Sequence, residues 1–225
     1  MTLPVQPSQD ASGCINGLLT RIQALRSRHQ RLLLGLTGEP GAGKSTLASA
    51  LLERLGHDAA VVLPMDGFHL AGAELERLGR TRRKGAIDTF DGHGFVHTLD
   101  RISEQRLRGA SAAQTVYAPA FDRELEEPIA GAIAVEPDHD IVIVEGNYLL
   151  AEQAPWEQVP ALLTATWFLR VNTPLRQQRL VARHERHGRS PAAARAHALG
   201  SDQANADFIA STAHHADLIV ELPCN

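Results

Sequence analysis

The chain has 225 residues, of which 22 are lysine or arginine and 26 are aspartate or glutamate, so its formal net charge is −4. A chain of this length is most simply one domain, and a negative net charge argues against general nucleic-acid binding, which needs a basic surface. No signal-peptide pattern is present, and no apolar run approaches the roughly 20 residues that cross a bilayer. We therefore expect a cytoplasmic protein with no nucleic-acid or membrane partner, and the sequence leaves its oligomeric state open, a homodimer included.

The two ends of the chain carry its only two cysteines. Cys14 and Cys224 are too far apart in sequence for a disulfide framework or a Cys-x-x-Cys metal site, so we expect free thiols. We expect residues 1–30 to form a loose tail and a helix, and residues 31–225 to form a single domain.

A phosphate-binding loop follows the first expected strand. Residues 38–45 read Gly-Glu-Pro-Gly-Ala-Gly-Lys-Ser and fit the pattern G-x-x-x-x-G-K-[S/T], between an apolar run at 32–36 and a helical stripe at 47–55 that stops at Gly56. In such a loop backbone N–H groups surround an anion, Lys44 reaches the β- and γ-phosphates, and the Ser45 hydroxyl ligates Mg²⁺. The expected nucleotide contacts are therefore Gly38, Gly41, Ala42, Gly43, Lys44, Ser45 and Thr46.

The rest of the chain alternates between apolar strands and helices. Further strands are expected at residues 59–64, 141–144, 166–171 and 218–222, and helices at 14–30, 92–109 and 174–188. Strands separated by helical crossovers indicate an α/β fold with a mostly parallel, five-stranded core sheet and helices on both faces, the three-layer sandwich of P-loop proteins.

One segment interrupts the alternation. Residues 115–137 contain short β-like runs broken by Pro119 and Pro128, which indicates an inserted hairpin or cap. Such insertions commonly carry substrate specificity, so we expect this one on the substrate side of the site.

Two acidic residues follow apolar strands. Asp66 comes after the strand at 59–64, and Glu145 ends the run at 141–144. Because ligands of parallel sheets lie at the carboxyl ends of the strands, we expect both carboxylates near Lys44. One carboxylate can accept a proton from an attacking hydroxyl while the other orients Mg²⁺. The structural alternatives are a turn-forming Asp66 and a solvent-facing Glu145.

A basic helix follows the fourth strand. Thr173 and Pro174 are expected as its N-cap and first residue, and at 100° per residue Arg176, Arg179, Arg183 and Arg186 fall within an arc of about 80°. A mobile flap with this stripe, at residues 174–200, could close over a triphosphate and stabilise the transferred phosphoryl group. The alternative is a solvated basic face.

These motifs together resemble the phosphoribulokinase, uridine kinase and bacterial pantothenate kinase superfamily. The resemblance rests on the phosphate loop, Asp-Gly-Phe-His at 66–69, Arg-Lys-Gly at 83–85, Glu-Gly-Asn-Tyr at 145–148 and the arginine helix. It spans residues 32–222 and is closest to small bacterial nucleoside kinase-like proteins, some of them described as fructose transport system kinases. The resemblance implies ATP- and Mg²⁺-dependent phosphorylation of a hydroxyl on a small metabolite such as a nucleoside, a sugar or a pantothenate-like compound.

The resemblance also assigns roles to individual residues. Asp66 is implied as the general base, Lys44 and Arg183 as catalytic cations, Arg179 and Arg186 as nucleotide contacts on a lid, and Ser45 with Glu145 as metal contacts. Where the family has Pro-x-Tyr-Asp, this chain has phenylalanine at 121 in place of the tyrosine, which weakens the case for uridine as the substrate. The candidate substrate contacts are His69, Arg83, Tyr117, Asp122, Arg123 and Glu145.

Two other classes share the phosphate loop. A regulatory GTPase normally needs an Asn-Lys-x-Asp motif, which is absent because Lys44 and Lys84 are the only lysines. A nucleotide-binding regulatory NTPase without an acceptor is the alternative function, and Asp66 argues against it. A zinc site is not predicted, because His184 and His187 form a helical pair without a third ligand and the pair at 214–215 is equally weak.

Overall fold

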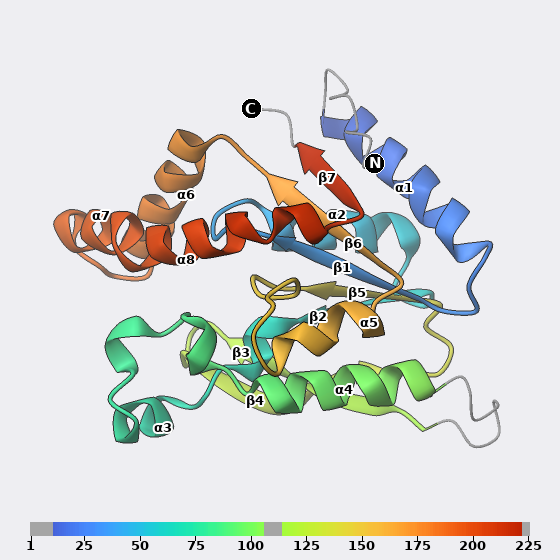
Figure 1. Ribbon diagram of the computed structural model, residues 1–225, viewed down its shortest axis with the longest axis horizontal. Helices are drawn as coiled ribbons and strands as arrows, with labels where there is room; N and C mark the ends of the chain where they lie inside the picture. The colour runs from blue at the N-terminus through green and yellow to red at the C-terminus, as the bar shows by residue number, and fades with distance from the viewer. Residues whose placement is uncertain (1–10, 106–113, 222–225) are drawn as a thin grey trace.

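The computed structural model describes residues 11–105 and 114–221, and its centre is a five-stranded sheet (Figure 1). The strand order is β2-β5-β1-β6-β7, and every neighbouring pair is parallel. The strands are β1 Leu32–Gly38, β2 Ala60–Pro64, β5 Ile141–Glu145, β6 Ala165–Arg170 and β7 Leu218–Glu221. The predicted five-stranded α/β core is therefore confirmed.

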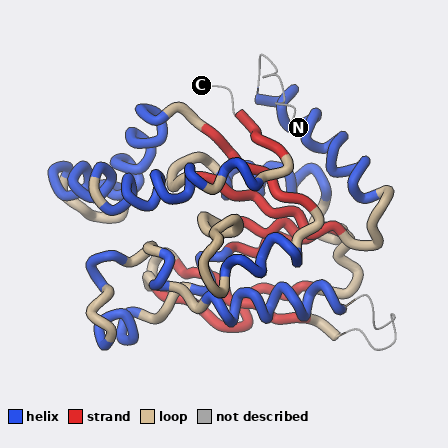
Figure 2. Tube along the Cα trace, in the orientation of Figure 1, coloured by secondary structure: helices blue, strands red, loops and turns tan. Residues whose placement is uncertain are grey.

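Helices cover both faces of this sheet, which gives three layers (Figure 2). One face packs against α1 Ala11–Arg26 and α2 Lys44–Leu55 through buried leucines that include Leu18 and Leu51. The other face packs against α4 Gly92–Glu104, α5 Val159–Leu162 and the end of α8 Ser201–Ser211. Among the described helices, none combines the length and the apolar character that a membrane crossing needs.

The apolar runs of the sequence explain the central strands. Every residue of β1 and of β5 is buried, as expected for parallel strands covered on both sides. Helix α2 ends where Gly56 takes a φ of 87°, a conformation that glycine adopts without steric cost. The sequence thus sets both the strand that leads into the phosphate loop and the end of the helix that leaves it.

The segment at 115–137 forms an antiparallel hairpin at the lower edge of Figure 1. Its strands are β3 Val116–Asp122 and β4 Glu127–Val135, which pair with each other and not with the main sheet. The hairpin packs against the 3₁₀ turn η1 Met65–Phe68, which follows β2.

Three helices after β6 form a lobe, which we call the lid: α6 Thr173–Arg186, α7 Pro191–Leu199 and α8. Asn172, and not the predicted Thr173, is the N-cap of α6, because the Asn172 side chain accepts a hydrogen bond from the Leu175 backbone N–H at 3.4 Å. The sequence did not predict several short elements, which are η1, α5, α3 Gly72–Arg77, η2 Thr81–Arg83, η3 Ile87–Thr89 and η4 Trp156–Gln158; a further short element is η5 Ala213–His215.

Some predictions fall outside the described residues. These are the tail before residue 11, the end of the predicted helix beyond residue 105, the last residue of the strand at 218–222, and Cys224.

Helix α1 contributes Cys14, Leu18 and Ile22 to the buried core, so it is packed onto the same unit as the sheet.

Candidate active site

The register of the sheet brings three loops together at its carboxyl edge. Glu145 on β5 aligns with Leu36 on β1 and with Pro64 on β2. The phosphate loop begins two residues after Leu36, and Asp66 lies two residues after Pro64. Glu145 is therefore flanked by the phosphate loop on one side and by Asp66 on the other.

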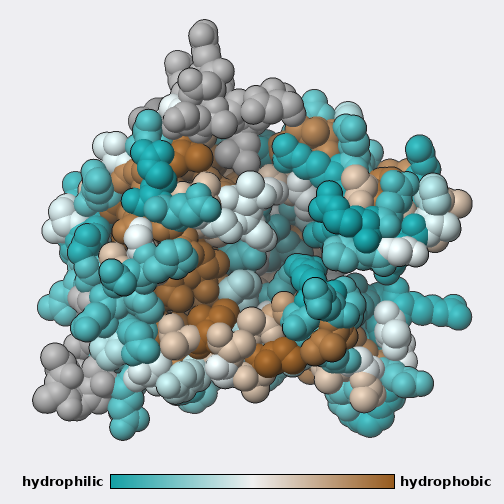
Figure 3. Space-filling model, turned by 180° about the vertical axis from the view of Figure 1, so that it is seen from behind, coloured by the Kyte–Doolittle hydropathy of each residue, from teal (hydrophilic) through white to brown (hydrophobic). Residues whose placement is uncertain are grey.

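A cavity of about 1000 Å³ lies at this edge, bordered by the phosphate loop, η1, the hairpin and the lid. Figure 3 shows the surface hollowed between the lid lobe and the lobe below it, with hydrophilic groups along the opening. The predicted site residues that line the cavity are Gly41, Gly43, Lys44, Ser45, Thr46, Asp66, His69, Arg123, Glu145, Arg179, Arg183 and Arg186. Most of the predicted site therefore assembles around one space.

The phosphate loop has the backbone that its glycines permit. Gly41 and Gly43 have φ values of 83° and 95°, which side chains with a Cβ rarely adopt. A Cβ at residue 41 would also lie 2.9 Å from the carbonyl oxygen of Arg176 on α6. The loop leads directly into α2, whose N-terminus adds a favourable field for an anion.

Lys44 is held in the loop by three hydrogen bonds. Its Nζ donates to the backbone oxygens of Gly38 at 2.8 Å and Glu39 at 3.2 Å, and to Oδ1 of Asn147 at 2.6 Å. Burial lowers the pKa of the Lys44 ammonium to about 8, although Glu145 and Asp66 act in the opposite direction. A negative charge placed in the loop would favour the charged form and raise this pKa.

Ser45 and Glu145 form an oxygen-rich pair beside Lys44. The Ser45 hydroxyl lies 2.9 Å from Oε1 and 3.1 Å from Oε2 of Glu145. Burial raises the pKa of the Glu145 carboxyl, while Lys44 opposes that shift. A hydroxyl and a buried carboxylate are hard oxygen donors of the kind that Mg²⁺ prefers, so these residues fit that ion.

Asp66 lies in η1 and faces the hairpin. Its Oδ2 accepts a hydrogen bond from Nη2 of Arg123 at 2.6 Å. The next residue, Gly67, permits close packing of the hairpin, because a Cβ there would lie 2.2 Å from the carbonyl oxygen of Pro119. The Asp-Gly pair therefore places a carboxylate at the cavity while the hairpin backbone packs directly behind it.

Aromatic side chains form a wall on the Asp66 side of the cavity. The ring of His69 lies 4.0 Å from that of Phe90 and 4.9 Å from that of Phe121, measured between centroids. Lys84 Nζ lies 4.8 Å from the Phe121 centroid, over the ring. Burial lowers the pKa of His69, which favours a neutral imidazole at neutral pH.

The lid contributes three of the four arginines of the predicted stripe. Arg179, Arg183 and Arg186 line the cavity, and Arg183 is close enough to lower the pKa of Lys44. Arg176 does not join them. It is fully buried beneath the phosphate loop, where its Nε lies 3.5 Å from Oε1 of Glu39.

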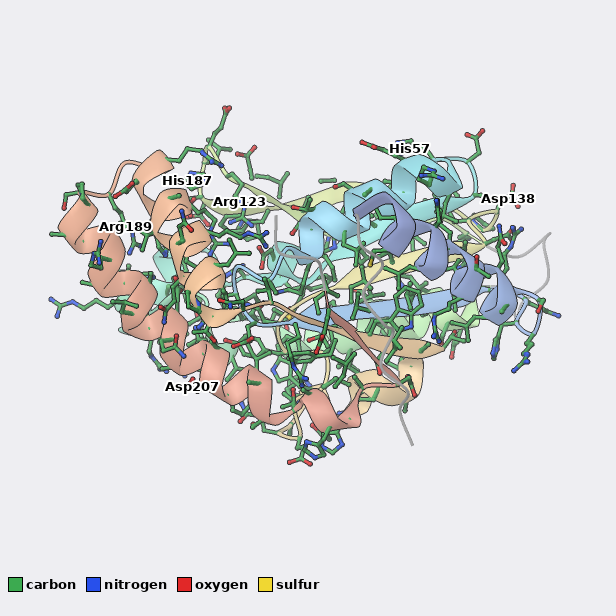
Figure 4. All side chains as sticks on the ribbon, turned by 90° about the horizontal axis from the view of Figure 1, so that it is seen from above. His57, Arg123, Asp138, His187, Arg189 and Asp207 are labelled. Carbon is green, nitrogen blue, oxygen red and sulfur yellow. The ribbon has the colours of Figure 1, made fainter. Side chains whose placement is uncertain are left out.

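Figure 4 labels three cavity residues, one on the hairpin side and two on the lid. His187 and Arg189, at the end of α6 and just after it, lie on the same side of the molecule as Arg123. All three side chains line the cavity. Cationic groups therefore border the opening from both lobes.

Five predicted contacts do not line the cavity. Arg83 pairs with Asp88, with a shortest N–O distance of 2.6 Å, and Tyr117 is 62% exposed. Asp122 caps the hairpin turn by accepting hydrogen bonds from two backbone N–H groups, at 2.8 and 3.0 Å. None of these three side chains lines the cavity. The other two residues belong to the phosphate loop: the Gly38 carbonyl accepts a hydrogen bond from Lys44, and Ala42 is fully buried.

Several residues that line the cavity were not among the candidate contacts, although three of them, Lys84, Phe121 and Asn147, stand in the predicted site motifs. Asn147 binds Lys44, and Lys84 and Phe121 complete the wall beside Asp66. Cys14 and Ile15 of α1 also line the cavity. Asn147 follows a strand-end acid by two residues, and this position after a buried strand was the signal that could have marked it.

Proteins of similar sequence are named as kinases. A Schizosaccharomyces pombe protein named as a uridine kinase is 35% identical over 178 residues, which are 74% of this chain and 72% of that protein. An Aspergillus versicolor protein named as ATP-dependent kinase-like is 38% identical over 151 residues, which are 64% of this chain and 86% of that protein. No protein-family model matches the chain.

Solved structures of similar fold are also named as kinases. A crystal structure from Silicibacter sp. TM1040, named as a fructose transport system kinase, is 37% identical with a TM-score of 0.75, covering 94% of this chain and 99% of that one. The fold is also that of YFH7 from Saccharomyces cerevisiae, at 19% identity and a TM-score of 0.77, covering 96% of this chain and 99% of that one. The chain thus belongs to the P-loop kinase superfamily of uridine kinases and bacterial pantothenate kinases. It is an ATP-dependent phosphotransferase that acts on an alcohol group.

Proposed function

We propose that this cavity transfers the γ-phosphoryl group of ATP to a hydroxyl of a small metabolite, with Asp66 as the general base. One observation carries the proposal: Lys44, Glu145 and Asp66, which follow or end three different strands, line the same cavity. A cation, a metal-binding carboxylate and a base around one space are the parts that phosphoryl transfer requires. Glu145 lies between the other two groups. Because the phosphates would bind at Lys44 on one side of it, the acceptor would bind at Asp66 on the other side.

The nucleotide side consists of the phosphate loop and the lid. The backbone from Gly41 to Thr46 would bind the phosphates, and Lys44 would move its three hydrogen bonds to the β- and γ-oxygens. Arg179, Arg183 and Arg186 would approach the triphosphate from the lid, with Arg183 nearest to Lys44. These cations would neutralise the charge that spreads over the transferred group.

The residues around Ser45 would hold Mg²⁺. Ser45 and Glu145 supply oxygen donors, and burial of Glu145 makes a free carboxylate there costly unless a cation is near. These two residues would hold Mg²⁺, which would supply positive charge against the phosphates. Ser45 and Glu145 would also orient the phosphates.

The acceptor would lie against the wall of His69, Phe90 and Phe121. A nucleoside, a sugar or a pantothenate-like compound fits this class of site, which combines ring faces with the cations Lys84 and Arg123. The names of the relatives, among them uridine kinases and pantothenate kinases, are consistent with such acceptors. The acceptor hydroxyl would displace Arg123 from Asp66 and give its proton to that carboxylate as the oxygen attacks the γ-phosphorus in line. The bond from the γ-phosphorus to the β–γ bridging oxygen breaks as the new bond forms, and ADP leaves with that oxygen.

The test uses purified full-length chain with ATP, Mg²⁺ and a panel of nucleosides, sugars, glycerate and pantothenate. We expect ADP release that depends on one class of acceptor, with the phosphorylated product detected by mass spectrometry. Arg83→Gln serves as a matched control, because Arg83 lies outside the cavity, and it should retain the activity. Turnover with GTP only, or ADP release with no dependence on any acceptor, would contradict the proposal.

A further inference from the structure

The three lid helices bring together two imidazoles and a carboxylate. His184 comes from α6, His197 from α7 and Asp202 from the first turn of α8. Nε2 of His184 lies 2.7 Å from Oδ2 of Asp202, and Nε2 of His197 lies 3.8 Å from Oδ1. One ligand atom from each residue fits within 4.8 Å of the others, so the side chains surround a common point.

Burial separates this cluster from an ordinary surface ion pair. The side chains of His184 and Asp202 are each 12% exposed, and that of His197 is 20% exposed. All three also line the cavity, so an ion could enter from that side. The proposed transfer of phosphate uses none of them.

The geometry suits a small divalent ion. With bonds of about 2.1 Å, tetrahedral coordination places neighbouring ligand atoms about 3.3 to 3.4 Å apart. The 2.7 Å contact of His184 ends on Oδ2 of Asp202, and the 3.8 Å contact of His197 ends on Oδ1. One ligand atom from each of the three residues lies within 4.8 Å of the others, so an ion that enters between them would replace the contact between His184 and Asp202 and need an inward movement of the side chains.

The donor set selects among ions. Two imidazole nitrogens and one carboxylate oxygen match Zn²⁺, Co²⁺ or Ni²⁺, whereas Mg²⁺ prefers oxygen donors such as those at Ser45 and Glu145. We propose that His184, His197 and Asp202 bind one transition-metal ion of the zinc class, with water as the fourth ligand. Such an ion would join α6, α7 and α8 and make the lid more rigid.

Nearby charges limit the affinity. Arg183 and Arg189 lie close enough to His197 to act on it electrostatically, and both repel a cation. A site with one carboxylate and two arginines nearby should therefore bind more weakly than a closed structural zinc site.

The test is a titration of the full-length chain with Co²⁺, without ATP and in excess Mg²⁺, so that oxygen-only sites are already filled. We expect one equivalent of Co²⁺ to bind with the intense visible absorption of tetrahedral coordination. His184→Ala and His197→Ala should each weaken binding at least tenfold. His187→Ala is the matched control, because His187 lines the cavity nearby but lies outside the cluster, and it should bind as the unchanged chain does.

A second measurement guards against variants that fold poorly. Zn²⁺ should raise the melting temperature of the unchanged chain and of His187→Ala, and it should leave that of Asp202→Asn unchanged, with circular dichroism confirming that each variant is folded. Equal binding by all variants, or no tetrahedral spectrum in the unchanged chain, would overturn the assignment. Neither measurement needs ATP turnover, so this test succeeds or fails independently of the proposed kinase reaction.

Discussion

Nη2 of Arg123 lies 2.6 Å from Oδ2 of Asp66, so the hairpin places a cation on the carboxylate that we propose as the base. The two side chains are 50% and 32% exposed, which leaves the pair within reach of a ligand. Exposed ion pairs add little to folding stability. We therefore expect this contact to matter for the acceptor more than for the fold.

Replacing Arg123 should affect the acceptor and not the nucleotide. In Arg123→Met we expect kcat/KM for the acceptor to fall about tenfold or more, because Arg123, once displaced from Asp66, would donate a charged hydrogen bond to the acceptor, and such a bond contributes about 1.5–3 kcal/mol. The Kd for ATP should stay within about twofold, since Glu145 lies between the phosphate loop and Asp66, the partner of Arg123. Steady-state kinetics and calorimetric titration measure the two quantities, and an equal loss in both would place Arg123 on the nucleotide side instead.

The lowered pKa of Lys44 predicts a proton linkage. With a pKa of about 8, roughly half of the Lys44 side chains are neutral at pH 8 in the free protein. Bound phosphates favour the charged form and raise that pKa, so ATP binding at pH 8 should take up about half a proton per chain. It follows that ATP affinity should fall as the pH rises above 8.

Calorimetry in two buffers of different ionisation enthalpy measures this uptake. Lys44→Met should show no proton uptake. Lys84→Met is the control: it changes the chain's other lysine, which lies on the acceptor wall, and it should keep the uptake. Proton uptake that persists in Lys44→Met would assign the linkage to another group.

Glu145 should set the Mg²⁺ requirement. In Glu145→Gln we expect the Mg²⁺ concentration for half-maximal activity to rise about tenfold or more, because a neutral amide is a poorer ligand for this ion. ATP binding without Mg²⁺ should be unchanged or tighter, since the variant loses a negative charge beside the phosphates. Glu152→Gln is the control, because the Glu152 side chain is 77% exposed. An unchanged Mg²⁺ dependence in Glu145→Gln would show that Glu145 does not bind the metal.

The buried pair of Arg176 and Glu39 should couple the lid to the phosphate loop. The Arg176 side chain is fully buried, and its Nε and Nη1 have no hydrogen-bond partner among the described residues. Arg176→Met should lower the free energy of unfolding by about 3 kcal/mol, because it leaves Glu39 without its cation. The double variant with Glu39→Gln should lose at least about 1 kcal/mol less than the sum of the single losses, as measured by urea denaturation. Additive losses would show that the two residues do not interact.

The sequence predicted those parts of the site whose signals are local. The phosphate loop has a fixed spacing, and Asp66 and Glu145 stand at the ends of apolar strands, so the parallel sheet itself brings them together. The five strands were predicted for the same reason, because each is a short apolar run. The roles of the phosphate loop, Asp66 and Glu145 in phosphate transfer stay predictions until they are tested.

Other parts depend on contacts that no local pattern contains. An arc of about 80° on α6 spans both the cavity and the interior, so helical spacing alone could not tell Arg179 from the buried Arg176. The pairing register of the hairpin shifts between Ala118 and Ala120, so simple alternation along β3 could not show that Phe121 lines the cavity while Tyr117 is exposed. The partners of His184 lie on two other helices, and only the packed lid brings them together.

The most direct test of the proposed reaction compares catalysis with nucleotide binding in Asp66→Asn. We predict that kcat for the acceptor identified in the panel falls by about 10² to 10⁴-fold, because the amide cannot take the hydroxyl proton, while the Kd for ATP stays within about twofold. Turnover in Asp66→Asn at the rate of the unchanged chain would contradict the account.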